Sequence, residues 1–182
     1  MKAAINNKYL ILAIKVLIIL FASTVYSQNY FPEPITSPLV CDFLGKITIN
    51  GLPASPGDEI AFFNSQGNIC ARFVVKQSGL YGFLHVYGDD PASQTIEGAY
   101  SGEKLLIQVW DSSHNILFTN HQIFLSPGDK GGSAIPSPIP PVFQSNNRYV
   151  LNIDAKKLTY DINRSGKTDI QDIIHILQYL SR

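Results

Sequence analysis

The stretch GKITINGLPASPGDEIAFF (residues 45–63) shows the pattern that decides the fold. GKITI (45–49) alternates apolar and polar side chains, as a half-buried strand does. NGLPASPGD (50–58) concentrates Asn, Gly, Pro and Asp, which favour tight turns. EIAFF (59–63) is a second apolar run of strand length. We therefore predict two short strands joined by a turn.

The same succession of short apolar runs and turn residues continues to about residue 155. The further runs are ICARFVV (69–75), YGFLHVY (81–87), KLLIQVW (104–110), ILFT (116–119), HQIFL (121–125) and RYVLNI (148–153). Such β-branched and aromatic runs at near-regular spacing are typical of antiparallel sandwiches and barrels. Before Asp169 no window of helical length carries an apolar helical stripe. We predict a mainly β fold, an antiparallel β-sandwich of about seven or eight strands.

The N-terminus has the layout of a secretory signal. Lys2, Lys8 and Lys15 form a basic region before a short apolar segment, VLIILFA (16–22), and Val25 and Ser27 are small enough for a cleavage site just before Gln28. The longer apolar run from Tyr9 to Val25 is still shorter than the about 20 residues of a membrane span, and it contains Lys15. We predict that residues 1–27 are a cleaved signal peptide and that the protein is secreted, extracellular or at the cell surface, with the periplasm as an alternative.

Composition and motifs point away from nucleic acid and from catalysis. The formal net charge is zero, and no basic block is present to hold a phosphate backbone. The histidines do not share a metal-binding spacing, and no GxSxG or phosphate-cradling glycine loop occurs. The histidines are His85, His114, His121 and His175. We predict no catalytic residues.

The two cysteines, Cys41 and Cys70, leave two alternatives open. An exported chain is oxidised in its compartment, so neighbouring strands could join them in a disulfide. Free cysteine also packs as a small hydrophobic residue, so two separate buried thiols are equally consistent with the sequence. Trp110 ends an apolar run and is predicted to belong to the core.

The loop GDDPASQTIEG (88–98) brings Asp89, Asp90 and Glu97 into one segment. Three carboxylates in one loop are compatible with a second cation site. Asp and Asn also favour turns, especially before proline, as Asp90 stands here. We favour a solvated turn.

A proline-rich loop (134–143) raises the question of a domain boundary. It contains IPSPIPP (135–141), which suits a stiff linker. RYVLNI (148–153) follows it. A single apolar strand outside a domain would have no other element against which to bury its apolar side chains, so this run is expected to pair with the sandwich. We therefore predict a sandwich domain of residues 28–157 that includes the proline-rich loop, followed by a separate C-terminal unit, 158–182.

DINRSGKTDIQD (161–172) has the spacing of a calcium loop. Calcium takes six to eight oxygen ligands, and a chain supplies them at alternate residues only by curling sharply. Gly166, at the sixth place, stands where that bend needs a glycine. The predicted ligands are Asp161, Asn163, Ser165, the backbone carbonyl of Lys167, Asp169 and Asp172.

Helix capping is the alternative interpretation of this loop. Asp169 suits the N-cap of a following helix, and Asp172 suits its first turn. The helix would then have an apolar face and no metal; that face consists of Ile170, Ile173, Ile174, Leu177 and Leu180. Capping accounts for two of the matched positions and leaves the others unexplained. We favour calcium, with which capping is compatible.

DINRSGKTDIQDIIHILQYL (161–180) is similar to one calcium-binding repeat of a type I dockerin, which has a loop and an exit helix. Ser165 stands where that family usually has aspartate, and one repeat is present where dockerins carry two. The resemblance implies docking to a cohesin-like domain, often within polysaccharide-degrading assemblies. A second copy of the same tail is the other partner it allows.

The sandwich carries a second resemblance. GKITINGLPASPGDEIAFF (45–63), GNICARF (67–73) and YGFLHVYGDDP (81–91) resemble small bacterial carboxypeptidase-regulatory or transthyretin-like modules. That resemblance implies an Ig-like or transthyretin-like sandwich in an exported or surface protein.

Together these observations predict an exported, non-catalytic, calcium-binding docking protein. The alternative is a carbohydrate- or surface-binding sandwich whose tail is only a structural calcium staple.

Overall fold

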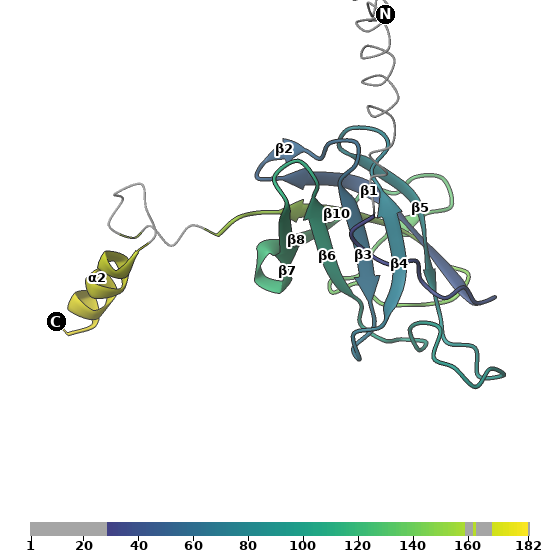
Figure 1. The fold of residues 1–182 in the computed structure, drawn as a ribbon. Coiled ribbons are helices and arrows are strands. Elements are labelled where there is room, and N and C mark those ends of the chain that lie inside the picture. The colour runs from purple at the N-terminus through teal and green to yellow at the C-terminus, as the bar shows by residue number, and fades with distance from the viewer. Residues whose placement is uncertain (1–28, 159–161, 163–168, 182) are drawn as a thin grey trace, which may run out of the picture.

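The computed structural model describes residues 29–158, 162 and 169–181, and it arranges them as two β-sheets and one C-terminal helix (Figure 1). The predicted mainly β sandwich is confirmed. The elements are β1 (Val40–Ile49), β2 (Leu52–Pro53), β3 (Glu59–Phe63), β4 (Ile69–Val74), β5 (Leu80–Tyr87), β6 (Leu106–Asp111), β7 (Ile116–Thr119), the 3-10 helix η1 (Asn120–Gln122), β8 (Ile123–Pro127), β9 (Ile135–Pro136), β10 (Arg148–Ala155) and α2 (Ile170–Leu180). The predicted signal peptide, residues 1–27, lies outside the described residues.

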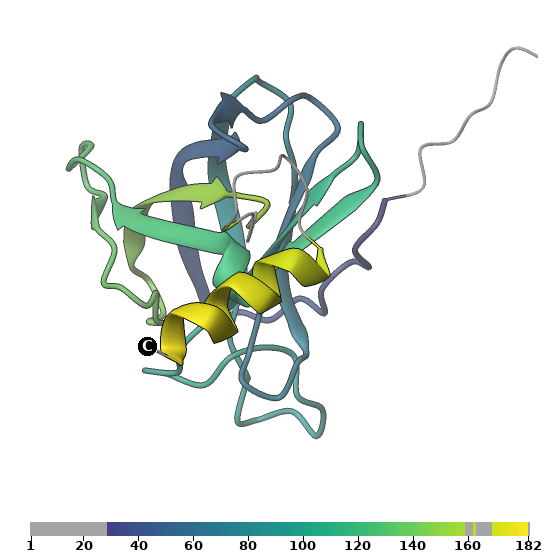
Figure 2. The ribbon, with the colours of Figure 1, turned by 90° about the vertical axis from the view of Figure 1, so that its left-hand side faces the viewer.

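Strand β1 is the centre of the first sheet. It pairs with β10 along one edge, and with β5 and β2 along the other. Strands β8 and β9 pair with the far edge of β10. The second sheet has the order β4-β3-β6-β7 and is antiparallel throughout. The two sheets face each other in Figures 1 and 2.

The sandwich is mostly antiparallel, as predicted, but two strand pairs of the first sheet are parallel. β1 and β10 run parallel, in the register Asp42↔Arg148 to Ile49↔Ala155. β9 and β10 are parallel as well. Parallel neighbours need a long connection, and nearly the whole sandwich lies between β1 and β10 in the chain. The first and last long strands therefore close the domain side by side.

Several element boundaries differ from the sequence prediction, most clearly those of β1 and β8. β1 begins at Val40, five residues before the predicted start, because Cys41 and Phe43 continue the buried side of the strand. The predicted run 121–125 begins instead with the 3-10 turn η1, and β8 starts at Ile123.

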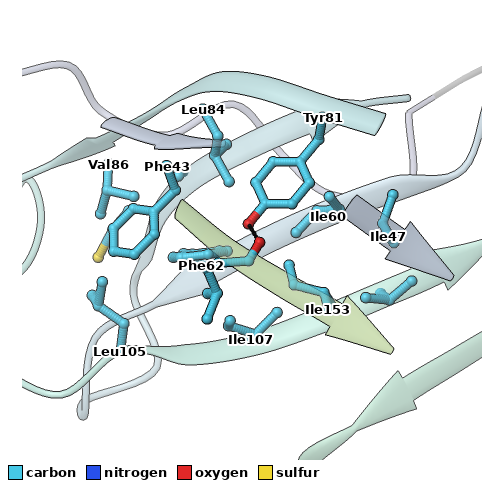
Figure 3. Packing of buried hydrophobic residues seen from close by; sticks show 14 of the residues in the cluster. Phe43, Ile47, Ile60, Phe62, Tyr81, Leu84, Val86, Leu105, Ile107 and Ile153 are labelled. Atoms are coloured by element: carbon cyan, nitrogen blue, oxygen red, sulfur yellow. Dashed lines mark hydrogen bonds between the residues drawn. The ribbon is translucent and has the colours of Figure 1, made fainter. Parts of the chain in front are cut away.

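The core lies between the sheets and is built mainly from the inward sides of the longer strands (Figure 3). Phe43 of β1 and Phe62 of β3 meet across the interface with ring centroids 5.0 Å apart. Ile47, Leu84 and other fully buried aliphatic side chains surround them. Successive side chains of a strand point to opposite faces of the sheet, so every second residue of these strands faces the core.

Gly45 is the point at which three strands of the first sheet are tied together. A side chain there would stand 2.0 Å from the carbonyl oxygen of Leu151 on β10, so only glycine fits. The hydroxyl of Tyr81, whose backbone pairs with Gly45, donates a buried 2.6 Å hydrogen bond to that same carbonyl. Burial in this position raises the pKa of the tyrosine. Asn152 completes the junction by accepting from the Lys46 N–H at 3.1 Å.

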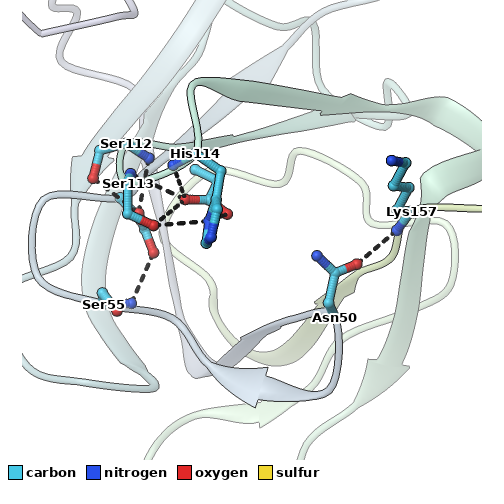
Figure 4. A network of polar contacts seen from close by, with 8 residues as sticks. Asn50, Ser55, Ser112, Ser113, His114 and Lys157 are labelled. Carbon is cyan, nitrogen blue, oxygen red and sulfur yellow. Dashed lines mark hydrogen bonds and ion pairs between the residues drawn. The ribbon is translucent and has the colours of Figure 1, made fainter.

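The chain is held on the sandwich as far as Lys157. Asn50, in the β1–β2 turn, donates its backbone N–H to the Ala155 carbonyl at 2.7 Å. Its side-chain oxygen accepts from the Lys157 N–H at 2.8 Å (Figure 4). Beyond this point α2 stands apart from both sheets in Figure 1.

The proline-rich segment is attached to the sandwich, because β9 pairs with β10 and Val142 forms a β-bridge with Lys104. Among the described residues no helix is long and apolar enough to cross a membrane.

Replacement of Gly45 by alanine is expected to destabilise the sandwich by roughly 3 kcal/mol or more, because the new methyl group displaces a buried carbonyl. Gly82→Ala is the matched control, since nothing lies within 4 Å of a Cβ built there. Chemical denaturation of both variants measures the difference. Equal stabilities would show that the close approach at Gly45 is not a constraint.

Candidate functional site

Helix α2 begins with the cap that the sequence predicts. Asp169 is the N-cap residue, and its side chain accepts from the Gln171 N–H at 2.8 Å. Asp172 reciprocates by accepting from the Asp169 N–H at 2.8 Å. This reciprocal arrangement satisfies backbone donors that the first helical turn leaves without partners. The expectation of a capped helix is confirmed.

Asp172 does more than cap the helix. It is 2 % exposed, whereas the other described residues of α2 are exposed. Its second carboxylate oxygen, Oδ1, accepts from the backbone N–H of Ile162 at 2.7 Å. Ile162 is the second residue of the predicted calcium loop and Asp172 the twelfth. One buried carboxylate therefore joins the start of the loop to its end.

The structure places two of the six predicted calcium ligands, Asp169 and Asp172. The other four, Asp161, Asn163, Ser165 and Lys167, lie outside the described residues. Within the described part of the chain, no three His, Cys, Asp or Glu side chains gather into a metal-binding cluster. The calcium site remains a prediction.

The exposed surface of α2 is mostly apolar, and its exposed polar residues are Gln171, His175 and Gln178. Its exposed large apolar residues are Ile170, Ile173, Ile174, Ile176, Leu177, Tyr179 and Leu180. No lysine or arginine lies on the helix, and its one carboxylate, Asp172, is buried. Ile162, Ile176 and Tyr179 also line a groove of about 330 Å³ beside the helix. Contiguous exposed apolar patches on proteins occur at interaction sites, in ligand grooves and on aggregation-prone surfaces.

The acidic loop of the sandwich is a set of turns. Asp90 accepts from the Ala92 N–H at 2.9 Å, and Asp89 accepts from the Glu97 N–H at 3.2 Å. Glu97 in turn accepts from the Asp90 N–H and from the Thr95 hydroxyl. Each carboxylate thus serves the local backbone, as the turn interpretation predicts.

A contact between Asp111, Ser113 and His114 escaped the sequence analysis (Figure 4). The Asp111 carboxylate accepts from the Ser113 hydroxyl at 2.7 Å and contacts His114 Nδ1 at 2.8 Å. Burial raises the pKa of Asp111, but the hydrogen bonds from Ser113 and His114 outweigh it and the pKa is lowered. The serine oxygen contacts the same ring nitrogen, Nδ1, at 2.9 Å. A hydrolytic triad uses opposite ring nitrogens for the serine and the acid, so this cluster has the geometry of a turn.

Trp110 is not part of the core, and this corrects the sequence prediction. It is half-buried on the outer side of the second sheet, where the ring of Tyr30 stacks on it with centroids 3.9 Å apart. The segment around Tyr30 is anchored there because the backbone N–H groups of Tyr30 and Phe31 donate to the buried carboxylate of Glu59. Trp110 is therefore covered by the chain itself.

Both cysteines are free and buried, so the disulfide alternative is excluded and the alternative of separate thiols holds. Burial, the largest influence, raises the pKa of Cys41 and of Cys70 to about 12. Thiols with raised pKa values in apolar surroundings are inert, because the thiolate is the reactive form.

Comparisons of the chain with protein-family models, with curated proteins and with solved structures found no match.

We expect Ellman's reagent to label neither cysteine in the native protein and both after denaturation, because both thiols are buried and protonated at neutral pH. Time-resolved absorbance with and without denaturant measures this. Rapid native labelling would contradict the burial, and absence of labelling after denaturation would reveal a disulfide.

Proposed function

We propose that the C-terminal unit is a calcium-ordered docking module of an exported protein and that the β-sandwich carries it. The observation that carries the proposal is the 2.7 Å hydrogen bond from the Ile162 N–H to the buried Asp172 carboxylate. Capping explains the bond between Asp169 and Asp172, but it gives no reason for a link ten residues along the chain. A loop that wraps around a bound ion does give a reason, because it brings its second and twelfth residues together.

The donor set fits a hard cation. Asp161, Asn163, Ser165, the Lys167 carbonyl, Asp169 and Asp172 all offer oxygen, which calcium prefers. Calcium would supply the charge that holds the carboxylates together and so order the loop. In a unit too small to bury a core of its own, such ordering contributes directly to folding.

The apolar surface of α2 supports docking to a separate protein of cohesin type. The exposed side chains from Ile170 to Leu180 cover a broad arc, because Ile176 adds a second row beside the stripe that contains Ile173 and Leu177. A single facing helix contacts a narrow seam, whereas a groove or sheet surface contacts a broad arc. Eleven residues of helix extend about 16 Å. Two such helices alone bury less than the about 1,200 Å² typical of stable interfaces, so a second copy is the less favoured partner.

Asp172→Ala is expected to abolish calcium binding and to leave the sandwich folded, because it removes the twelfth ligand and the link to Ile162. Calorimetric titration of the full chain measures the binding, and near-ultraviolet circular dichroism reports on the sandwich. Asp90→Ala, in a turn of the sandwich, is the control. Wild-type calcium affinity in the Asp172 variant would refute the ligand assignment.

Leu177→Glu is expected to weaken docking about ten- to hundredfold, because a side chain fully buried at the interface contributes about 1.5–3 kcal/mol. Gln178→Glu adds the same charge one residue along and is the matched control. Biolayer interferometry against a panel of recombinant cohesin domains, with calcium or with chelator, gives the affinities.

Calcium-dependent capture by a cohesin domain, lost in Leu177→Glu and kept in Gln178→Glu, supports the proposal. No capture by any member of the panel overturns the cohesin-type partner. Calcium-dependent dimers in analytical ultracentrifugation would assign the surface to a second copy instead.

A further inference from the structure

The outer side of the first sheet, which faces away from the core, carries a row of polar side chains. His85 on β5, Asp42 on β1 and Arg148 on β10 stand side by side, because Asp42 is the register partner of both the others. Three neighbouring strands thus place three chemically different groups in one line across the sheet. The junction at Gly45, which fixes the order of these strands, lies just beyond the row.

Hydrogen bonds fix the row in one arrangement. Asp42 Oδ1 contacts His85 Nδ1 at 2.6 Å, and Oδ2 accepts from Arg148 Nη2 at 3.2 Å and Nε at 3.3 Å. Ser133 accepts from Arg148 Nη1 at 3.1 Å. Within the described part of the chain, His85 Nε2 and two N–H groups of Arg148 have no protein partner. The row therefore presents oriented hydrogen-bonding groups to solvent.

A β-bulge adds an exposed aromatic ring to this surface. One residue of β1, Leu44, stands opposite two of β5, Gly82 and Phe83, so the side-chain alternation of β5 is shifted there. Phe83 has a φ of 52°, which a bulky side chain rarely adopts, and is 58 % exposed. The guanidinium of Arg148 lies over its ring, 5.1 Å from the centroid. Bulges re-aim side chains and cluster near functional sites, as strained backbone does.

The row borders a cleft of about 630 Å³, within the range of small-ligand sites. Its lining mixes polar and apolar side chains: Asp42, His85, Arg148, Asn147, Tyr87 and Ile135. Formal charges balance, because the Asp42 carboxylate neutralises the Arg148 guanidinium directly. An anionic ligand would find no net positive charge. A wholly apolar ligand would leave the polar side chains of the row without hydrogen-bond partners.

We propose that this cleft binds a neutral saccharide. Sugar hydroxyls are paired donors and acceptors that match planar guanidinium, imidazole and amide groups, and the C–H face of a sugar ring packs on an aromatic ring. Arg148, His85 and Asn147 supply the planar groups, and Tyr87 supplies a ring in the lining of the cleft. Phe83 does not line the cleft but lies beside it, where its ring contacts the Arg148 guanidinium. The proposal goes beyond calcium-dependent docking, since no residue of the cleft lies in the C-terminal unit.

Affinity electrophoresis of the full chain tests the proposal. The gels contain xyloglucan, galactomannan, mixed-linkage β-glucan, starch or dextran as neutral probes, and polygalacturonate as an anionic probe. We expect retardation by at least one neutral polysaccharide. It should persist in chelator and in high salt, because neither calcium nor screened charges hold the ligand.

Arg148→Ala, His85→Ala and Phe83→Ala are each expected to weaken that retardation about tenfold. Lys156→Ala is the matched control, because Lys156 also pairs with an aspartate, Asp154, and lies 5.4 Å from the ring centroid of Phe124. Thermal melts confirm that each variant is folded, and His85 and Phe83 are exposed enough for replacement without loss of the fold.

Three results would overturn the proposal: no retardation by any neutral probe, retardation that the Arg148, His85 and Phe83 variants all keep, or retardation by polygalacturonate alone that disappears in salt. None of them bears on the docking function, which is measured with calcium and protein partners.

Discussion

The hydrogen bond from the Tyr81 hydroxyl to the Leu151 carbonyl, made directly over Gly45, is the interaction on which the rest of the structure depends. It spans β5, β1 and β10 at a place where β1 and β10 cannot pair regularly, since the register resumes only at Ile47. A buried carbonyl left without a donor would cost about 1–3 kcal/mol. The tyrosine supplies the donor, and the absence of a side chain at position 45 makes room for it.

This junction sets the positions of both candidate functional surfaces. Toward one end of β1, the fixed register aligns Asp42 with His85 and Arg148, and the bulge beside Gly45 turns Phe83 outward. Toward the other end, Asn50 holds the chain at Lys157 before it leaves for α2. A single central strand thus presents the polar cleft at one end and the C-terminal unit at the other.

The sequence predicts what is local, and it misses what depends on pairing between distant strands. Strands β3 and β7 have the predicted bounds, because turn residues enclose short apolar runs. The cap at Asp169 was predicted because its spacing from Asp172 is a local signal. The parallel pairing of β1 with β10, the stacking of Tyr30 on Trp110 and the alignment around Asp42 join residues far apart in the chain. No local pattern carries that information.

Helix α2 is an exception to the way the rest of the chain obtains its stability. The strands bury their apolar side chains between two sheets, whereas α2 exposes almost all of its own. An isolated helix shorter than about 12 residues is marginal in water. Its capping box and the link from Asp172 to Ile162 stabilise its first turn, but they bury none of the apolar residues from Ile173 to Leu180. Most helical stability in proteins comes from packing such a face, so the apolar sequence of α2 is consistent with the docking surface proposed for it.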